Sequence, residues 1–504
     1  MRTDRARAVA LDTAIAASLG AIFSLGFVHT SAWWLQFACI GLLAWGVSRV
    51  SVRRAALLGS AFGTAWLAAG TWWLFISMHR YGGLPAPMAV LAVAALVAGL
   101  SLFPAAAMAL FARLRRGPML ADALLFGACW LGAELARGLV FTGFPWVATG
   151  YGQVDAPLAA AAPWVGVYGI GAVVATLAAG LAFSEGIKSQ LVAAAAVAAV
   201  VFATPLLLSR DFTTSAGRIG VTLVQTSVPQ NEKFVPQFLS ETLEWLQQTL
   251  AAAPGPLVVA PETAIPLLPE QLGDDGWQRF AAPFREGERG ALIGLPLGDY
   301  DAGYTNSVAG LSKDAPQPFY RYDKQHLVPF GEFIPDGFRW FTDMMNIPLG
   351  NFARGPRVPP SFVFAGQRIG PNICYEDLFG EELARRFGDA ASAPTILANV
   401  SNMGWFGDTI ALPQHLNISR LRSLELQRPM IRATNTGATA AIDHRGVVTA
   451  LMEPLQRGVL QAEVEGRNGV TPFARWAEAF GLWPLALLAL LLVAVCGRWK
   501  KPAP

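Results

Sequence analysis

The chain has 504 residues, of which 53% are hydrophobic and 14% carry a charge. This composition is too apolar for an ordinary soluble enzyme and indicates a protein embedded in a membrane. The formal net charge of +3 is too small to suggest a nucleic acid as partner.

Apolar segments long enough to cross a bilayer occupy most of the first 208 residues and return near the C-terminal end. About 20 apolar residues are needed, because a helix rises ~1.5 Å per residue and the hydrocarbon layer is ~30 Å thick. We place eight spans at 9–27, 31–49, 55–78, 86–112, 119–137, 163–185, 189–208 and 477–496. The sequence thus predicts a multi-span helical bundle, with a seven-span domain over 1–208 and an eighth span with a tail over 477–504.

Lysine and arginine in the connecting loops indicate the orientation of the bundle, because basic flanks stay in the cytoplasm. They cluster before the first span and after the second, fourth and eighth spans, whereas the alternate short loops hold only Arg80 and Arg137. We therefore expect both termini in the cytoplasm and the polar stretch 209–476 on the outer face of the membrane.

The stretch 209–476 alternates short β-rich runs with amphipathic helices, which is typical of a layered α/β domain. Strands are expected at 219–225, 257–260, 291–295, 307–311, 369–373, 395–399, 439–443 and 459–463. Helices are expected at 236–252, 277–286, 379–387 and 412–428. The Pro/Gly-rich segment 329–360 is expected to form long irregular loops.

Cys374 is the only cysteine outside the apolar segments, since Cys39, Cys129 and Cys496 lie within them. A thiol with no disulfide partner is either an inert buried residue or a nucleophile. The Cys/His spacing typical of a metal site does not occur.

Two further groups come at the ends of predicted elements, as Cys374 does. Glu262 follows the strand at 257–260, and Lys324 lies in the run Tyr322-Asp323-Lys324. A thiol needs a base, and acyl transfer needs a cation where the carbonyl oxygen becomes negative, so the three residue types together suit acyl transfer. Glu262 could instead cap a helix, and Lys324 could be exposed to solvent. His326 could pair with Cys374, so a Cys-His dyad is a further alternative.

At these residues the chain resembles the nitrilase superfamily, whose catalytic set is Glu-Lys-Cys on an αββα sandwich. When these residues are taken together with the eight predicted spans, the chain resembles the apolipoprotein N-acyltransferase family over nearly its whole length. That family is the membrane-embedded branch of the nitrilase superfamily. Further matches are Gly143-Phe144-Pro145-Trp146, Gly150-Tyr151-Gly152-Gln153, Ser401-Asn402, Trp405-Phe406-Gly407 and Arg432-Ala433-Thr434-Asn435-Thr436-Gly437. The chain departs from the family at Phe234, where tryptophan is frequent, and at Met403-Gly404, where Asp-Ala is common.

The resemblance implies an N-acyltransferase of the bacterial inner membrane, with its nitrilase-like domain over 209–476 on the periplasmic face. It would move an acyl chain from a membrane phospholipid, through a thioester, to the α-amine of the diacylglyceryl-cysteine of an apolipoprotein. This is the final step of bacterial lipoprotein maturation. A monomer that needs no cofactor and no metal is expected.

The resemblance also implies the residue roles. Cys374 is the expected nucleophile and Glu262 the general base, while Lys324 and the backbone amide of Tyr375 would stabilise the oxyanion. Supporting roles are expected for Glu332, which would position Lys324, for Glu376, which would hold the turn after the nucleophile, and for Asn306, which would orient Glu332. Candidates for the acyl-chain slot are Phe234, Phe352, Tyr375 and Trp405.

Each supporting residue has a simpler alternative. Glu332 could make a surface ion pair, Glu376 could be a buried anchor without catalytic effect, and Asn306 could be a turn residue.

Two other functions stay open at this point. One is a membrane-tethered amidase or nitrilase, with water as acceptor, and the other is a transporter or scaffold with a binding domain. Charged residues are scarce within the spans, which weighs against transport.

Overall fold

The structure is a computed structural model that describes residues 2–273, 275–299, 303–334 and 352–499. The chain forms two compact units. One consists of Met1–Phe75, Pro85–Arg210 and Phe480–Pro504, and the other of Ile76–Leu84 and Asp211–Ala479. Of the long loop expected over 329–360, residues 335–351 lie outside the described part of the chain, as do the last residues, 500–504, of the expected tail.

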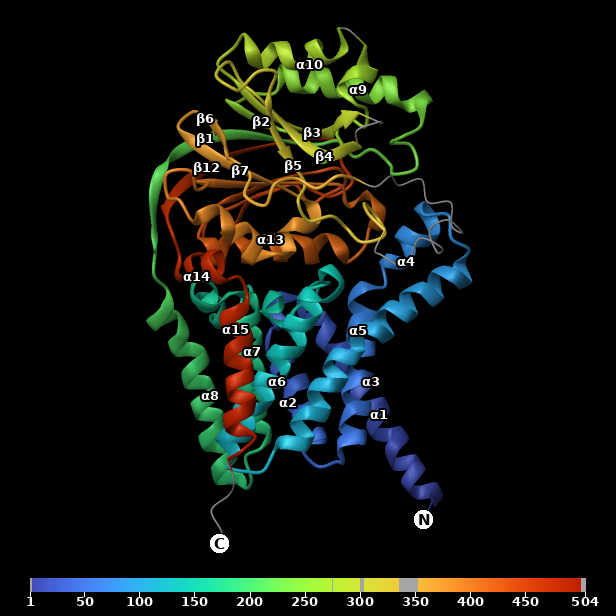
Figure 1. The fold of residues 1–504 in the computed structure, drawn as a ribbon, viewed down its shortest axis with the longest axis vertical. Coiled ribbons are helices and arrows are strands. Elements are labelled where there is room, and N and C mark those ends of the chain that lie inside the picture. Colours follow the sequence, from blue (N-terminus) through green and yellow to red (C-terminus); the bar gives the residue numbers. More distant parts are fainter. Residues whose placement is uncertain (1, 274, 300–302, 335–351, 500–504) are drawn as a thin grey trace. The chain divides into compact units, whose positions relative to one another are not determined.

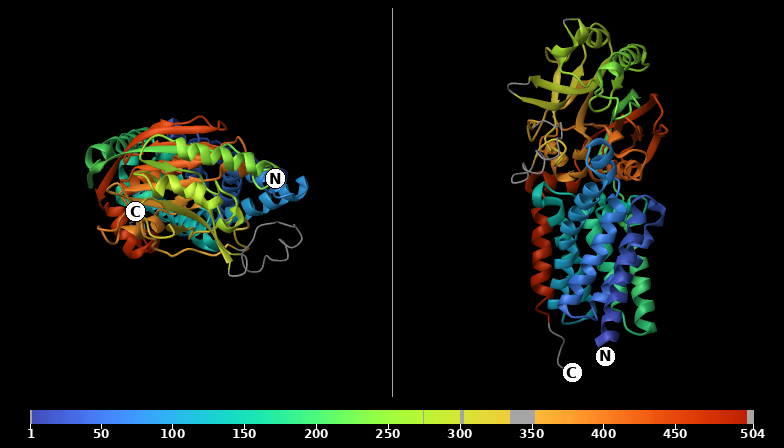
Figure 2. Two further views of the ribbon diagram at one scale, coloured as in Figure 1. Left: turned by 90° about the horizontal axis from the view of Figure 1, so that it is seen from above. Right: turned by 90° about the vertical axis from the view of Figure 1, so that its right-hand side faces the viewer.

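The first unit is a bundle of long helices that run side by side (Figures 1 and 2). Its helices are α1 (Arg2–Ser24), α2 (Trp34–Val47), α3 (Val52–Thr71), α5 (Ala86–Leu114), α6 (Met119–Leu139), α7 (Ala162–Ala182), α8 (Ile187–Leu208) and α15 (Trp483–Cys496). Each predicted span overlaps one of these helices.

By length and apolar composition, five stretches of the described chain could cross a membrane. They are Ala6–Phe27, Ala86–Leu114, Met119–Thr142, Pro157–Ala182 and Ile187–Leu208. A sixth arises if α14 (Pro472–Phe480) and α15 count together, although the pair is bent by 89°. The remaining two predicted spans correspond to α2, which has only 14 residues, and to α3, which begins next to Arg53 and Arg54. A helical unit with about five apolar candidate spans is therefore confirmed, while the number of eight spans stays a prediction.

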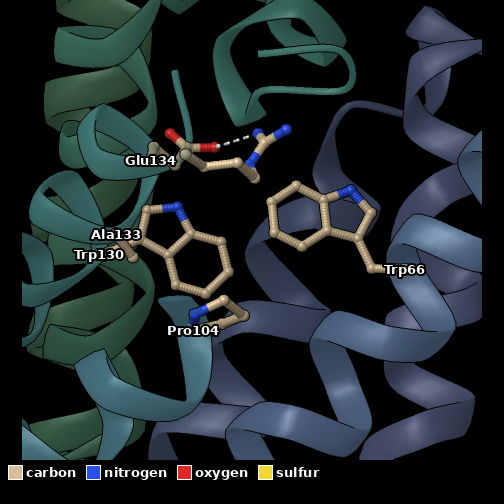
Figure 3. Close-up of a pocket in the computed structure, with 6 residues that line it drawn as sticks. Trp66, Pro104, Trp130, Ala133 and Glu134 are labelled. Atoms are coloured by element: carbon tan, nitrogen blue, oxygen red, sulfur yellow. Dashed lines mark ion pairs between the residues drawn. The ribbon is translucent and has the colours of Figure 1, made fainter. Parts of the chain in front are cut away.

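Aromatic side chains fill the interior of this unit. Trp66 and Trp130 stack with their ring centroids 5.8 Å apart, and Phe23 and Phe62 pack against both rings. Beside the two tryptophans lies a small pocket (Figure 3). It is lined by Trp66, Pro104, Trp130, Ala133, Glu134 and Arg137.

Glu134 and Arg137 connect α6 to the loop that follows it. Both side chains are buried, at 2% exposure, with 3.9 Å between Arg137 Nη2 and Glu134 Oε1. Arg137 donates to the carbonyl oxygens of Phe144 and Trp146, each at 2.7 Å, and Glu134 accepts from the backbone and hydroxyl of Thr149. The Gly-Phe-Pro-Trp motif is thus held by buried polar contacts, as polar groups removed from water require.

The second unit contains two six-stranded sheets. The first has the order β12 (Gly458–Gly469), β1 (Thr213–Gln225), β2 (Leu257–Val259), β3 (Gly290–Asp299), β4 (Gly303–Leu311), β5 (Tyr320–Asp323). The second has the order β11 (Val448–Leu451), β10 (Ala440–Ile442), β9 (Met430–Thr434), β8 (Ile396–Ser401), β7 (Gln367–Ile373), β6 (Phe362–Phe364). The central strands β1, β2 and β3 are parallel, as are β7, β8 and β9.

The two sheets pack face to face, and helices cover their outer faces (Figure 1). The inner core joins side chains of both sheets, among them Leu223, Leu292, Ile373 and Val400. Helices α9 (Pro236–Ala252) and α10 (Gly276–Arg285) cover the first sheet, and α12 (Gly380–Ala384), α13 (Ala411–Leu426) and α14 cover the second. This arrangement has the expected αββα order of layers.

All predicted strands and helices of this domain are present, with end points that shift by a few residues. The strands of the first sheet are longer than expected at β1, β3 and β4, and α9 has the expected bounds. Four strands that the sequence pattern did not predict complete the sheets, namely β5, β6, β9 and β11.

Candidate active site

Three strand ends carry the candidate catalytic residues. Glu262 comes shortly after β2, Lys324 follows the last residue of β5, and Cys374 follows the last residue of β7. Glu262 and Lys324 are buried, with 6% and 1% exposure, and Cys374 is half-buried. The ends of strands from both sheets therefore supply one site.

Lys324 lies between two carboxylates. Its Nζ is 2.8 Å from Glu332 Oε1 and 3.4 Å from Glu262 Oε1. Burial alone would lower the pKa of Lys324, but the charges of Glu332 and Glu262 outweigh it and raise this pKa. Lys324 thus remains a full positive charge inside the site, in direct contact with Glu332.

Asn306 connects the same two carboxylates. Its Nδ2 donates to Glu262 Oε1 and to Glu332 Oε1, each at 2.7 Å. The other oxygen of Glu262, Oε2, accepts the backbone N–H of Asn402 at 2.7 Å. Three donors, from Asn306, Lys324 and Asn402, therefore hold the Glu262 carboxylate in place.

Cys374 sits at a sharp turn with φ of 51°, in the left-handed region that a residue with a side chain rarely adopts. Burial raises the pKa of its thiol, Glu262 raises it further, and Lys324 opposes the increase. The sulfur is thus close enough to both groups to respond to their charges. The resting residue is a neutral thiol that needs a base before it can attack.

Glu376 holds the turn that contains the nucleophile. One oxygen accepts the N–H of Ile373 and the hydroxyl of Tyr322, each at 2.6 Å. The other accepts the N–H groups of Gln325 at 2.7 Å and His326 at 3.2 Å. Burial raises the pKa of Glu376, and these hydrogen bonds oppose that increase. Glu376 therefore ties the Cys374 turn to the segment that carries Lys324.

His326 makes contacts that suit a structural role. Its Nδ1 is 3.0 Å from Glu382 Oε2, and its ring stacks on Phe379 with centroids 3.6 Å apart. Among the described residues, no hydrogen bond joins His326 to Cys374. These contacts give the Cys-His dyad no support.

The aromatic candidates occupy different environments. Phe234 is 55% exposed, whereas Tyr375 is buried with its ring 5.3 Å from that of Phe379. Phe352 packs edge-on against Tyr304, at 4.9 Å between centroids. Trp405 packs edge-on against Tyr81, at 6.1 Å. The segment Ile76–Leu84, which contains Tyr81, thus belongs to the catalytic unit although it lies between two helices of the bundle in sequence.

Sequence reasoning missed functional contacts made by Lys233 and Asn402. Lys233 is buried, and its Nζ donates to the backbone oxygen of Glu262 at 3.2 Å. Burial lowers the pKa of Lys233 from 10.5 to about 8, although Glu262 opposes this change. The sequence showed Asn402 only as part of a motif. Its contact with Glu262 is made by the backbone N–H, and a pattern of side chains gives no signal for a backbone contact.

Comparisons with known proteins identify the relatives of this chain. Residues 19–180 match the model of the apolipoprotein N-acyltransferase N-terminal domain, and residues 221–469 match that of the carbon-nitrogen hydrolases. The chain is 52% identical to the apolipoprotein N-acyltransferase of Verminephrobacter eiseniae over 89% of each chain. It is 46% identical to that of Ralstonia nicotianae over 95% of this chain and 92% of the relative.

Among solved structures, a carbon-nitrogen hydrolase from Helicobacter pylori is 18% identical, with a TM-score of 0.37 over 53% of this chain and 94% of the other. The two family models and the curated relatives together assign the whole protein. This chain belongs to the apolipoprotein N-acyltransferase family.

Proposed function

We propose that this protein transfers an acyl chain from a membrane phospholipid to the α-amine of the diacylglyceryl-cysteine at the N-terminus of an apolipoprotein. The observation that carries the proposal is the cluster of the buried Glu262 and Lys324 with the half-buried Cys374 thiol in a member of this family. The transfer proceeds in two steps through a thioester on Cys374.

In the first step Glu262 takes the thiol proton while the sulfur attacks the ester carbonyl of the phospholipid. Base and nucleophile act together, because the raised pKa of Cys374 leaves little free thiolate. The tetrahedral oxyanion is stabilised by the Lys324 ammonium and by the backbone N–H of Tyr375. When the C–O bond breaks, Glu262 returns its proton to the leaving alkoxide. A thioester and a lysophospholipid result.

In the second step the α-amine of the apolipoprotein attacks the thioester. An α-amine has a reference pKa of ~7.7–8.0, so part of it is neutral near pH 7. Glu262 accepts a proton from the attacking nitrogen and delivers it to the leaving sulfur as the C–S bond breaks. The products are an amide and the resting thiol, so Glu262 and Cys374 return to their starting protonation states.

The supporting contacts fit these roles. Glu332 and Asn306 hold Lys324 and Glu262 at fixed distances, and Glu376 holds the nucleophile turn. Such preorganised groups need no rearrangement when charge develops. We propose further that Phe234, Phe352 and Trp405 contact the acyl chain. Phe234 is the most accessible of the three, at 55% exposure.

The proposal is tested by supplying purified protein with a phospholipid and a diacylated lipopeptide. Mass spectrometry should show the lipopeptide gaining one acyl group, and lysophospholipid should accumulate in equal amount. Release of fatty acid with an unchanged lipopeptide would instead indicate hydrolysis and reject the proposal. The Cys374→Ala variant is the matched control and should give neither product.

We propose a location and a topology on the same basis. Residues 1–208 and 477–504 would form an eight-span domain in the bacterial inner membrane, and 209–476 would form a periplasmic catalytic domain of a monomeric enzyme. The scarcity of basic residues in the alternate loops supports this orientation.

A pair of single cysteines tests the orientation in a Cys374→Ala background. Ser240→Cys lies at an exposed position of α9, and Lys188→Cys lies between the sixth and seventh predicted spans, where the chain is also exposed. An impermeant maleimide should label position 240 in intact spheroplasts and position 188 only after lysis. The opposite pattern would reverse the topology.

A further inference from the structure

A buried histidine contacts the backbone of the nucleophile turn. His415 lies on α13 and has no exposed surface. Its Nε2 is 3.2 Å from the backbone oxygen of Cys374, and its Nδ1 is 3.0 Å from Nη2 of Arg432. It approaches the backbone of the nucleophile and plays no part in the mechanism above.

The arginine determines which nitrogen of His415 carries the proton. A guanidinium can only donate hydrogen bonds, so Nδ1 of His415 must accept from Arg432. The ring is then neutral, and Nε2 carries the hydrogen that is donated to the Cys374 oxygen. Burial and the positive charge of Arg432 both lower the pKa of His415 far below its usual value, in agreement with a neutral ring.

Arg432 is itself held in place by buried partners. Its Nη1 lies 3.2 Å from Asp377 Oδ2, and both residues are fully buried. Ser419 hydrogen-bonds to both Arg432 and Asp377. The orientation of the His415 ring therefore rests on a connected set of paired groups that exclude water.

The peptide that joins Cys374 to Tyr375 connects this contact to catalysis. The peptide is planar and trans, so its C=O and its N–H point in opposite directions. A hydrogen bond that fixes the Cys374 oxygen therefore also fixes the direction of the Tyr375 N–H. The left-handed φ of Cys374 is strained and persists only where surrounding contacts hold it. Asn399 Nδ2, 3.4 Å from the same oxygen, is a second such contact.

We propose that His415 is a positioning residue, which holds the Cys374–Tyr375 peptide so that the Tyr375 N–H faces the oxyanion. This inference rests on the proposed function, because it assumes that Tyr375 donates to the tetrahedral intermediate. In this role His415 acts through the backbone oxygen of Cys374.

Two isosteric variants separate the two contacts of the ring. The amide of His415→Gln ends near the place of Nε2 and can still donate to the Cys374 oxygen. The amide of His415→Asn ends near the place of Nδ1, so it can still accept from Arg432 but does not reach Cys374. The two variants differ by one methylene group, and both keep a polar side chain in the buried site.

Two reactions of the same thiol are then measured. Acylation by phospholipid passes through an oxyanion, whereas alkylation of Cys374 by iodoacetamide is a direct displacement that forms none. Removal of one oxyanion donor costs about 10²- to 10³-fold in rate, so a misdirected donor should cost about 10- to 10²-fold. We expect this loss of acylation kcat in His415→Asn with little change in KM for phospholipid, and near wild-type acylation in His415→Gln. Alkylation should be unchanged in both variants.

Other results would overturn the inference. A wild-type rate of acylation in His415→Asn would show that the hydrogen bond to the Cys374 oxygen is not needed. Equal losses in both variants would show that a donor at the place of Nε2 makes no difference. A parallel fall of acylation and alkylation would indicate a merely structural effect. If wild-type protein itself formed no acyl-enzyme, the proposed function would fail instead, so the two failures are distinguishable.

Discussion

Replacement of Glu262 by glutamine tests the proposed base most directly. The carboxylate of Glu262 receives Asn306 Nδ2 and Lys324 Nζ at one oxygen and the N–H of Asn402 at the other. A glutamine has one oxygen and one NH₂ group, so in either orientation its NH₂ faces a donor. The variant therefore removes the proton acceptor and also places an NH₂ group opposite another hydrogen-bond donor.

The two effects have different magnitudes and different readouts. Loss of general base catalysis should slow acylation by about 10²- to 10⁴-fold. A buried donor without an acceptor costs about 1–3 kcal/mol, which should appear as lower thermal stability.

The assay is single-turnover acylation with a labelled phospholipid, followed by quantification of the Cys374 thioester. Glu241→Gln is the matched control, since Glu241 is exposed on α9, and it should acylate at the wild-type rate. If Glu262→Gln kept more than a tenth of the wild-type rate, Glu262 would not be the base.

Three further variants test other parts of the site. Cys374→Ala should give no labelled acyl-enzyme on a denaturing gel, and label persisting in this variant would assign the nucleophile elsewhere. Glu376→Gln should lose about 2–6 kcal/mol of stability. Each carboxylate oxygen of Glu376 receives two donors, and in the variant one of these oxygens becomes an NH₂ group. An unchanged melting temperature would contradict the anchoring role. Lys233 has its pKa lowered from 10.5 to about 8 in the folded protein. The unfolded chain therefore binds more protons between these values, and stability should rise with pH across this window by about 3 kcal/mol. The Lys233→Met variant should lose this rise in thermal unfolding measured at pH 8 and pH 10, and an equal rise in both proteins would refute the assignment.

The apolar patterns predicted the elements with uniformly buried faces. Strands β2 and β8 are short, fully buried runs in the middle of the parallel strands of each sheet, and such runs are recognisable in sequence. Strand β9 was missed because Arg432 lies in its middle, and an arginine there favours an exposed loop. In the structure Arg432 is fully buried, with its charge paired to Asp377. Burial of that charge depends on a residue far away in sequence.

The candidate site was predictable to the extent that its chemistry depends on side-chain type. Glu262, Lys324 and Cys374 were identifiable because acyl transfer needs a base, a cation and a nucleophile. The groups that orient them were not, because the Asn402 contact uses a backbone N–H and His415 lies on a helix with no distinctive spacing. These contacts can be identified only from the structure, because they join segments that are far apart in the sequence.

The packing of Tyr81 against Trp405 means that the catalytic unit is discontinuous in sequence. A recombinant fragment that began at Asp211 would lack Ile76–Leu84 and leave one edge of the Trp405 indole without its partner. During synthesis, the ribosome releases Ile76–Leu84 long before Trp405 emerges, so this contact forms only late in biogenesis. The folding of the enzyme thus includes a late step in which Trp405 packs against Tyr81. Pulse-labelling with a crosslinker at position 81 could follow this step in time.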